Sequence, residues 1–378
     1  MGAPDALDDL LGAVRRFGAA LAPDVRTEAA RNGLIPQPVL ADLLALGVQR
    51  APFPARCGGS GLGQYGYVAA LGELGKTDAS LGAVVMATVS ACTLLHQFGT
   101  SDQRRRWMRP ILAGAGLAAI AVSERGAGSD PSRTTLRAET DGAGTFRLHG
   151  HKAFITNAAH PDLATVVTLG REAEAGLSCF VLRGQAPGLT ASGPLRLIGW
   201  RAAAVGDLVF DGCRAERIGV PGKGLSQMLA VLTYGRMAIA ALGAGLCAAA
   251  LERALGHTLR TGEGGHRLWD HEAVSTHLVE MWVHLHIAAA LAQAAARAAD
   301  RGEDIRVSSA MAKLVASRSA VDSARSAVQV LGADGVSADG PIGRLYGDAK
   351  VLEIVEGTSE IQRTVLARAL EGMGEGLA

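Results

Sequence analysis

Hydrophobic positions divide the chain into regions of different period. Over roughly the first 116 residues, apolar side chains recur every three or four positions, as at Leu10, Val14 and Phe17. Prolines and a Gly-Gly-Ser-Gly cluster separate the segments. This spacing predicts amphipathic helices, including one over residues 81–98 and one over 102–112. The chain is therefore expected to begin with a helical domain.

The period changes at residue 118. Turn residues now separate short apolar runs at 119–122, 133–139, 145–149, 153–156, 165–169, 177–182 and 207–210. Such runs between Gly, Pro, Asp and Asn are typical of β-strands. We expect a small antiparallel β domain.

Long helical segments return after residue 224. Alanine-rich stretches at 225–259, 272–300 and 308–331 precede a final pair of shorter helices. Four or five helices of this length favour a bundle. The predicted fold is mainly α with a middle β domain. Its predicted parts are an N-terminal helical domain (1–117), a middle β domain (118–222) and a C-terminal helical bundle (223–378).

Composition narrows the possible partners. Hydrophobic residues make up 48% of the 378 residues, many of them alanine, which predicts closely packed helices. Lys and Arg total 37 against 36 Asp and Glu, so charge gives no reason to expect binding to nucleic acid or to a membrane surface. No run reaches about 18 apolar residues, which predicts no membrane span. Five cysteines without CxxC spacing, and no signal-peptide order at the start, predict a cytoplasmic location.

An acidic residue stands at the junction of the last two predicted helices. Glu356 follows the apolar segment 351–355 and precedes Gly357, Thr358 and Ser359. Gly357 permits a turn, and Thr358 or Ser359 can cap the next helix. A carboxylate held against apolar residues has a raised pKa, which suits a general base at neutral pH. Taken alone, an acid in the first turn of a helix is usually only a partner of the helix dipole.

Three further motifs allow a plain and a functional interpretation. The glycines of segment 123–130 let backbone N–H groups approach a phosphate or a flat ring, although the spacing matches neither Walker A nor GxGxxG. In segment 152–157, Phe154 can lie against a planar ring and Thr156 can donate to it. Segment 329–335 ends a long helix with a glycine cap. Individually, these motifs are better explained as a loop, a strand and a helix stop.

Together, in this order and spacing, the four motifs resemble the acyl-CoA dehydrogenase family of flavoproteins, over roughly residues 34–370. The resemblance implies the three-part fold above, with FAD between the last two domains and partly held by a neighbouring subunit of a homodimer or homotetramer. Glu356 would remove the α proton of an acyl thioester while hydride passes to flavin N5. The backbone N–H of Glu356 would hydrogen-bond the thioester carbonyl. An electron-transfer partner or oxygen would reoxidise the flavin.

The resemblance also implies contacts for each part of the cofactor. The middle domain would contact the flavin pyrimidine edge through Val122 and Ser123, the phosphate region through Gly128 and Ser129, and the ring near N5 through Phe154 and Thr156. The contacts from the bundle would be Gln329, Gly332 and Ala333 at the adenosine half from the partner subunit, and Thr358 and Glu360 at the pyrophosphate and adenine side. The substrate contacts would be Arg236 and Gly357.

Several positions depart from the family pattern. Relatives commonly carry Arg-x-x-Phe-Gly after the first bundle helix, whereas residues 260–269 keep Arg260, expected to reach the phosphate, without Phe-Gly. Arg125 replaces the usual proline, Thr233 replaces an acid, and Val355 replaces a tyrosine. The missing Phe-Gly pair concerns the binding of FAD, and the other three changes concern the thioester end of the substrate and the acyl pocket.

Two segments, 198–208 and 232–236, look closer to homologues of polyketide pathways. Those homologues act on small acyl groups held by an acyl carrier protein, for example in making methoxymalonyl-type extender units. Coenzyme A and a carrier protein therefore both stand as the expected carrier. If it is a protein, arginines between Arg104 and Arg109 would face its acidic helix, although a solvated helix face is the plainer interpretation.

Two other functions remain open. A flavin monooxygenase on the same scaffold is disfavoured because oxygen activation does not need an α-proton base at Glu356. A catalytically silent oligomeric binding protein gains weight from the missing Phe-Gly pair. No metal is expected, because His284-x-His286 on a helix points the two side chains to different faces.

Overall fold

The computed structural model describes residues 3–142, 144–260, 262–263, 265–338 and 340–375. Helices build the first part of the chain: α1 (Ala3–Ala20), α2 (Pro23–Asn32), α3 (Gln37–Ala45), α4 (Gly63–Thr77), α5 (Ala79–Phe98), α6 (Ser101–Gln103) and α7 (Arg109–Leu112). A π-helical turn, η3 (Arg104–Met108), joins the last two. The predicted N-terminal helices are confirmed, with this turn interrupting the one expected over 102–112.

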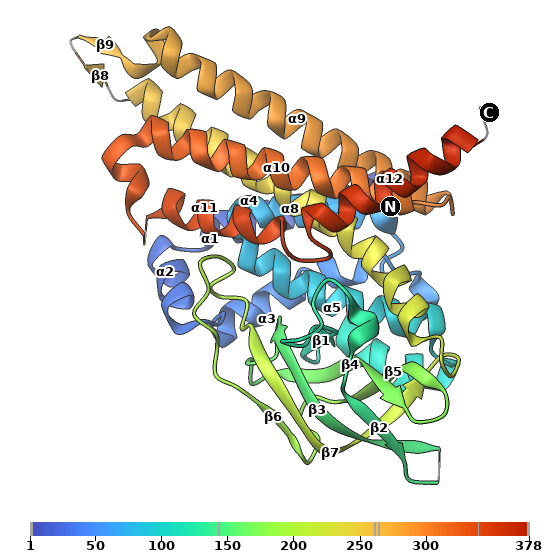
Figure 1. Cartoon of the computed structure of the whole chain (residues 1–378). Helices are drawn as coiled ribbons and strands as arrows, with labels where there is room; N and C mark the ends of the chain where they lie inside the picture. The colour runs from blue at the N-terminus through green and yellow to red at the C-terminus, as the bar shows by residue number, and fades with distance from the viewer. Residues whose placement is uncertain (1–2, 143, 261, 264, 339, 376–378) are drawn as a thin grey trace.

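Helix α5 lies at the centre of the molecule (Figure 1). It is buried from Ala79 to Leu95 and packs against α4, α8 and β1. Asp78 begins it by accepting a hydrogen bond of 2.8 Å from the N–H of Ser80. This cap satisfies an otherwise free donor, which fixes the start of the helix.

The middle part of the chain forms a closed barrel. Its strands are β1 (Leu117–Ala121), β2 (Arg137–Thr140), β3 (Thr145–Ile155), β4 (Leu163–Glu172), β5 (Gly176–Arg183), β6 (Leu189–Ala191) and β7 (Gly206–Ile218). Six of them pair in the order β1-β4-β2-β3-β7-β5, and β5 returns to β4, which closes the sheet; β6 pairs with β7. Its interior contains the edge-to-face pair Phe146 and Phe180, with ring centroids 5.1 Å apart.

The expectation of a purely antiparallel sheet is wrong. Strands β1 and β2 both run parallel to β4. Parallel neighbouring strands need a crossover connection. The alternation of side chains along a single strand does not show which strands are connected in this way. The two runs expected at 145–149 and 153–156 belong to the one strand β3.

The last part of the chain is the helical bundle. Its elements are α8 (Gly224–Arg260), β8 (Gly262–Glu263), β9 (His266–Arg267), α9 (Glu272–Asp300), α10 (Arg306–Leu331), α11 (Pro341–Leu352) and α12 (Ser359–Glu375). Small residues bring the helices close together. A Cβ added at Gly243 of α8 would lie 2.8 Å from the carbonyl oxygen of Ala316 on α10. The predicted mainly α fold with a middle β domain and a C-terminal bundle is confirmed (Figure 1).

Within the described residues, three helices are long and apolar enough, by length and composition, to cross a membrane: α5, α8 and α9. They meet this criterion although no unbroken run of about 18 apolar residues occurs in the sequence, because alanine raises the mean hydropathy without such a run. In this structure, 94% of the apolar window of α5 and 72% of that of α8 are buried, against 28% for α9. The first two helices therefore find their apolar surroundings inside the protein.

Candidate active site

A joint between α11 and α12 presents the carboxylate of Glu356. Glu356 and Gly357 both have left-handed backbone conformations, with φ of 54° and 86°. This conformation costs a non-glycine residue on the order of 1 kcal/mol, so surrounding contacts must hold it. Gln362 Nε2 donates to the carbonyl oxygens of Glu356 at 3.3 Å and Gly357 at 2.7 Å. Lys313 Nζ, from α10, donates to the same Gly357 oxygen at 2.8 Å.

The predicted cap of the last helix is confirmed. Thr358 Oγ1 accepts the N–H of Ile361 at 3.3 Å, and α12 begins at Ser359. Glu360 lies exposed in the first turn, beside Arg363. Thr358 and Glu360 therefore stand close to Glu356, as their proposed cofactor contacts require.

Around the joint, four enclosed polar atoms have no hydrogen-bond partner among the described residues: Glu356 Oε2, Gln362 Oε1, the Tyr67 hydroxyl and Arg236 Nε. Tyr67 on α4 is 3% exposed and Arg236 on α8 is 8% exposed. A Cβ added at Gly235 would lie 2.2 Å from Glu356 Oε2, so glycine leaves the space that the carboxylate fills. An enclosed polar group without a partner costs about 1–3 kcal/mol, which a polar ligand can offset.

Burial and charge tune this group of side chains. Burial raises the pKa of Glu356 to about 7, against the opposing charges of Arg236 and Lys313. Burial lowers the pKa of Lys313 to about 8, with Glu356 as the main opposing influence. The pKa of the Tyr67 hydroxyl is raised by burial and then by the charge of Glu356. Glu356 thus titrates near neutral pH, as a general base should.

A buried ion pair fixes the loop that follows β1. Lys152, fully buried on β3, donates from Nζ to Glu124 Oε1 and to the Val122 carbonyl oxygen, both at 2.9 Å. The carboxylate of Glu124 also accepts the N–H groups of Thr135 at 2.8 Å and Leu136 at 3.0 Å. The loop backbone is therefore held from behind.

The outer side of this loop is open. A Cβ added at Gly128 would meet nothing within 4 Å, and Ser129 is exposed. Ser123 is half-buried, and its carbonyl oxygen accepts the N–H of Ala153 at 2.9 Å. Ser129 and the backbone at Gly128 thus remain accessible to an anionic ligand.

Phe154 forms an exposed aromatic platform at the end of β3. Its side chain is 53% exposed and its φ is 58°, a left-handed conformation. The carboxylate of Asp207 accepts the Phe154 N–H at 3.0 Å and pairs with Arg125 at 2.6 Å. The Arg125 guanidinium carbon lies 5.3 Å from the centroid of the Phe154 ring. Thr156 follows, half-buried.

These features fit a flavin dinucleotide. The exposed Phe154 ring suits a planar ring system, and the open backbone at Gly128 suits a phosphate. The described residues contain no group of three or more His, Cys, Asp or Glu that could hold a metal ion.

One set of predicted cofactor residues lies far from Glu356 within this chain. Gln329, Gly332 and Ala333 are exposed at the end of α10, roughly 24 Å along the helix from Lys313. Arg260 is exposed at the end of α8, roughly 36 Å along the helix from Arg236. One chain therefore does not bring these four residues to the catalytic joint. The loop after Arg260 lies partly outside the described residues.

The sequence analysis did not identify three residues of the site: Lys313, Tyr67 and Gln362. Lys313 carried a usable signal, because it is a lone cation among alanines and serines on the buried face of α10. Tyr67 and Gln362 carried none, since their proximity to Glu356 depends on tertiary packing.

Comparisons with known proteins agree with this geometry. The chain matches the acyl-CoA dehydrogenase N-terminal domain over residues 4–115, the middle domain over 119–213 and the C-terminal domain over 222–371. It is 32% identical to the short-chain specific acyl-CoA dehydrogenase of Megasphaera elsdenii, covering 97% of this chain and 98% of that one.

Two solved structures add detail. Butyryl-CoA dehydrogenase from M. elsdenii superposes with a TM-score of 0.92 at 31% identity, over 97% of this chain and 98% of that one. FkbI, described for biosynthesis of the methoxymalonyl extender unit of the Fk520 polyketide, gives a TM-score of 0.85 at 30% identity, over 97% and 99%. The chain belongs to the acyl-CoA dehydrogenase family, whose members are FAD-dependent oxidoreductases acting on the CH–CH group of acyl thioesters.

Proposed function

We propose that this chain removes two hydrogens from the α and β carbons of a short acyl thioester, with Glu356 as the base for the α proton. The observation that carries the proposal is the enclosed Glu356 carboxylate, whose pKa is raised to about 7. A base with this pKa is partly ionised at neutral pH and strong enough to take a weakly acidic C–H proton. The short acyl group is inferred from the butyryl and short-chain relatives.

The chain's own residues supply the proton chemistry. The N–H of Glu356 donates to no other described residue, so it is available to the thioester carbonyl oxygen. A hydrogen bond at that oxygen stabilises the negative charge that develops as the α proton leaves. Glu356 Oε2 receives the proton; Gly235 leaves space for it, and Gln362 and Lys313 hold the backbone from which it extends. Bound FAD supplies the acceptor for the hydride from the β carbon.

The cofactor would be shared between subunits. Val122, Ser123, Gly128, Ser129, Phe154 and Thr156 would hold the flavin and phosphate side of the site. Arg260, Gln329, Gly332 and Ala333 would reach the adenosine half of a neighbour's FAD, because they stand far from the joint of their own chain. We therefore propose a homodimer or homotetramer, located in the cytoplasm and reoxidised by an electron-transfer protein or by oxygen.

The carrier of the acyl group is the finer part of the proposal. The relation to FkbI, at 30% identity over nearly the full length of both chains, supports a role in secondary metabolism. The likeness to AnaB, a prolyl acyl carrier protein oxidase, with a TM-score of 0.89 at 26% identity, supports a protein-bound acyl group. Similar identity to the short-chain enzymes supports coenzyme A. We propose that the enzyme accepts an acyl carrier protein as the natural carrier.

Anaerobic bleaching of the bound flavin tests the function. We expect butyryl thioesters, on coenzyme A or on an acyl carrier protein, to bleach the flavin absorption in a single turnover. If FAD binds, no thioester bleaches it, and the reduced protein consumes oxygen to hydroxylate a substrate, the chain is a monooxygenase. If purified protein binds no FAD, it is a silent binding protein.

A further inference from the structure

An open pocket of about 560 Å³ lies at the surface of the N-terminal domain, outside the catalytic joint. It is bounded by the short turn Ala55–Cys57, the end of α5, and the segment from α6 to α7. Its polar lining consists of Arg56, His96, Ser101, Arg104, Arg105 and Arg109.

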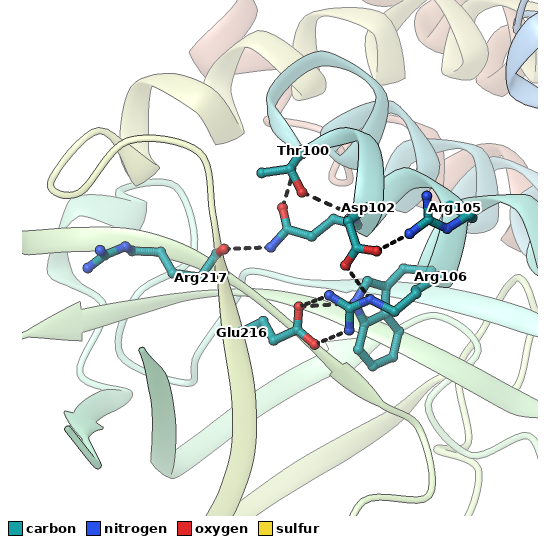
Figure 2. A network of polar contacts seen from close by, with 8 residues as sticks. Thr100, Asp102, Arg105, Arg106, Glu216 and Arg217 are labelled. Carbon is teal, nitrogen blue, oxygen red and sulfur yellow. Dashed lines mark hydrogen bonds and ion pairs between the residues drawn. The ribbon is translucent and has the colours of Figure 1, made fainter. Parts of the chain in front are cut away.

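The arginines of this region differ in whether an acid neutralises them, and Figure 2 shows two that are paired, Arg105 and Arg106. Arg105 pairs with Asp102 at 2.5 Å. Arg106, outside the pocket lining, pairs with Asp102 at 2.6 Å and with Glu216 of β7 at 2.7 Å. Both side chains are exposed, so the solvated-face interpretation describes these two, and their charges are balanced within the chain.

Arg56, Arg104 and Arg109 have no acidic partner within the described part of the chain. Arg104 donates only to neutral atoms, the His96 carbonyl oxygen at 3.1 Å and Ser101 Oγ at 3.3 Å. Arg109 donates to the Arg56 carbonyl oxygen at 2.8 Å. Three guanidinium groups thus line one pocket with most of their N–H donors free.

The imidazole of His96 lies close to two of these positively charged guanidinium groups. Its pKa is lowered first by burial and then by the charges of Arg104 and Arg56, which places both guanidinium groups near the imidazole. Its Nδ1 is enclosed without a partner among the described residues. Like charges held together this way repel one another, and an incoming anion would relieve that repulsion.

A hydrogen bond and an ion pair join the segment beside the pocket to β7, the strand that precedes α8. Gln103 Nε2 donates to the Arg217 carbonyl oxygen at 2.8 Å, and Arg106 binds Glu216 on the same strand, β7 (Figure 2). Residues 219–223 then connect β7 to α8, whose Gly235 touches Glu356 roughly 17 Å into the helix. The pocket and the helix that borders the catalytic base are therefore connected through β7 and the exposed residues 219–223.

We propose that the acid-free arginines Arg56, Arg104 and Arg109 form the docking site for acidic side chains of the protein that carries the acyl thioester. This rests on the proposed carrier-protein substrate. Charge complementarity is the reason, because exposed guanidinium groups without internal partners favour carboxylates and speed encounter with an acidic protein. Coenzyme A is also anionic, through its diphosphate and 3′-phosphate, and arginines bind phosphate as well as carboxylate. A docking site for the carrier protein is therefore distinguished from a phosphate site by its having no effect on the coenzyme A thioester.

The test compares one acyl group on two carriers. The FAD-loaded enzyme and its Arg56→Glu/Arg109→Glu double variant are mixed anaerobically with butyryl-CoA or with a butyryl-loaded acyl carrier protein. We expect the apparent KM for the carrier-protein thioester to rise about tenfold or more, with the KM for butyryl-CoA and both limiting bleaching rates unchanged. Arg104 is left in place because it is half-buried.

Arg147→Glu is the matched control. Arg147 is exposed on β3 and donates only to the Gly212 carbonyl oxygen at 3.0 Å, so its charge reversal should change neither KM. An unchanged KM for the carrier-protein thioester in the double variant would overturn the docking site while leaving the dehydrogenase intact. Bleaching by butyryl-CoA alone in the unaltered enzyme would overturn the assigned partner. No bleaching by either thioester would instead reject the function itself.

Discussion

At the scale of single residues, the site is a carboxylate whose freedom is limited by its neighbours. Glu356 could be found from the sequence because an apolar run leads directly into an acid followed by Gly-Thr-Ser. Gly235 could not, since its importance comes from a contact across 121 residues of chain. The residue that performs the chemistry was thus predictable, and the residue that makes space for it was not.

Gly235→Ala should impair catalysis without unfolding the protein. The new methyl group would lie 2.2 Å from Glu356 Oε2, so the carboxylate must move. A displacement of about 1 Å can cost roughly 100-fold in rate, and we expect a loss of this size in the rate of flavin bleaching. Gly72→Ala on α4 is the control, because its Cβ would meet Ala241 O at an ordinary 3.5 Å. Equal rates for the two variants would contradict the tight fit at Gly235.

Glu356→Gln should change the pH dependence of stability. A carboxyl group with a pKa of about 7 in the folded chain and 4.5 as its ordinary value binds protons more tightly when folded. Its stabilising contribution is therefore full below pH 4.5 and is lost as the pH rises to 7, by up to about 3 kcal/mol. The Glu356→Gln variant has no carboxyl group at this position, so its stability does not fall in this way as the pH rises.

Urea unfolding at pH 5 and pH 8 measures the effect. The stability of Glu356→Gln relative to the unaltered chain should increase between the two pH values. A difference that stays constant would show that burial does not raise the pKa of Glu356.

At the scale of elements, the joint between α11 and α12 depends on a third helix. Lys313 of α10 donates to the Gly357 carbonyl oxygen and places a positive charge near Glu356. The bundle helices were predicted within a few residues of their ends because their apolar spacing is regular. How these helices pack against one another could not be predicted, because the apolar pattern of one helix does not show which neighbouring helix its buried face contacts.

Lys313→Met should shift the pH profile of catalysis upward. Lys313 lowers the pKa of Glu356, so its removal lets that pKa rise above about 7. The base is then protonated over more of the neutral range, and bleaching at pH 7 should slow and partly recover at higher pH.

Lys350→Met controls for loss of a lysine. Lys350 is exposed on α11 and pairs with Glu353 at 2.6 Å. Its pH profile should match that of the unaltered enzyme. A Lys313→Met profile with the same midpoint would refute the electrostatic role, whatever the change in its height.

At the scale of the whole molecule, one chain provides only part of the expected cofactor site. The domain order could be read from changes in hydrophobic period, from helical to alternating and back. The parallel strand pairs and the closure of the barrel could not, because they depend on which distant strands meet. Arg260 and the end of α10 lie far along their helices from the residues beside Glu356, which is why we propose that a second chain uses them.

Arg260→Ala should therefore weaken FAD binding while sparing the catalytic step. The exposed guanidinium is proposed to contact the phosphate of a neighbour's cofactor, and its loss should raise the dissociation constant of FAD about tenfold. Flavin fluorescence on titration measures this value, and bleaching at saturating FAD should retain its rate. Arg301→Ala, in the turn after α9, should leave FAD affinity unchanged. Equal affinities in both variants would remove Arg260 from the cofactor site.

The central claim is that Glu356 takes the α proton. The most direct measurement is the anaerobic bleaching rate with butyryl-CoA and its α-deuterated form, from pH 5.5 to 9, for the unaltered enzyme and Glu356→Gln. We predict that the unaltered enzyme bleaches faster as the pH rises through about 7 and slows on deuteration, and that the variant does not bleach. Bleaching of the variant at a rate comparable to the unaltered enzyme would contradict the assignment of Glu356 as the base.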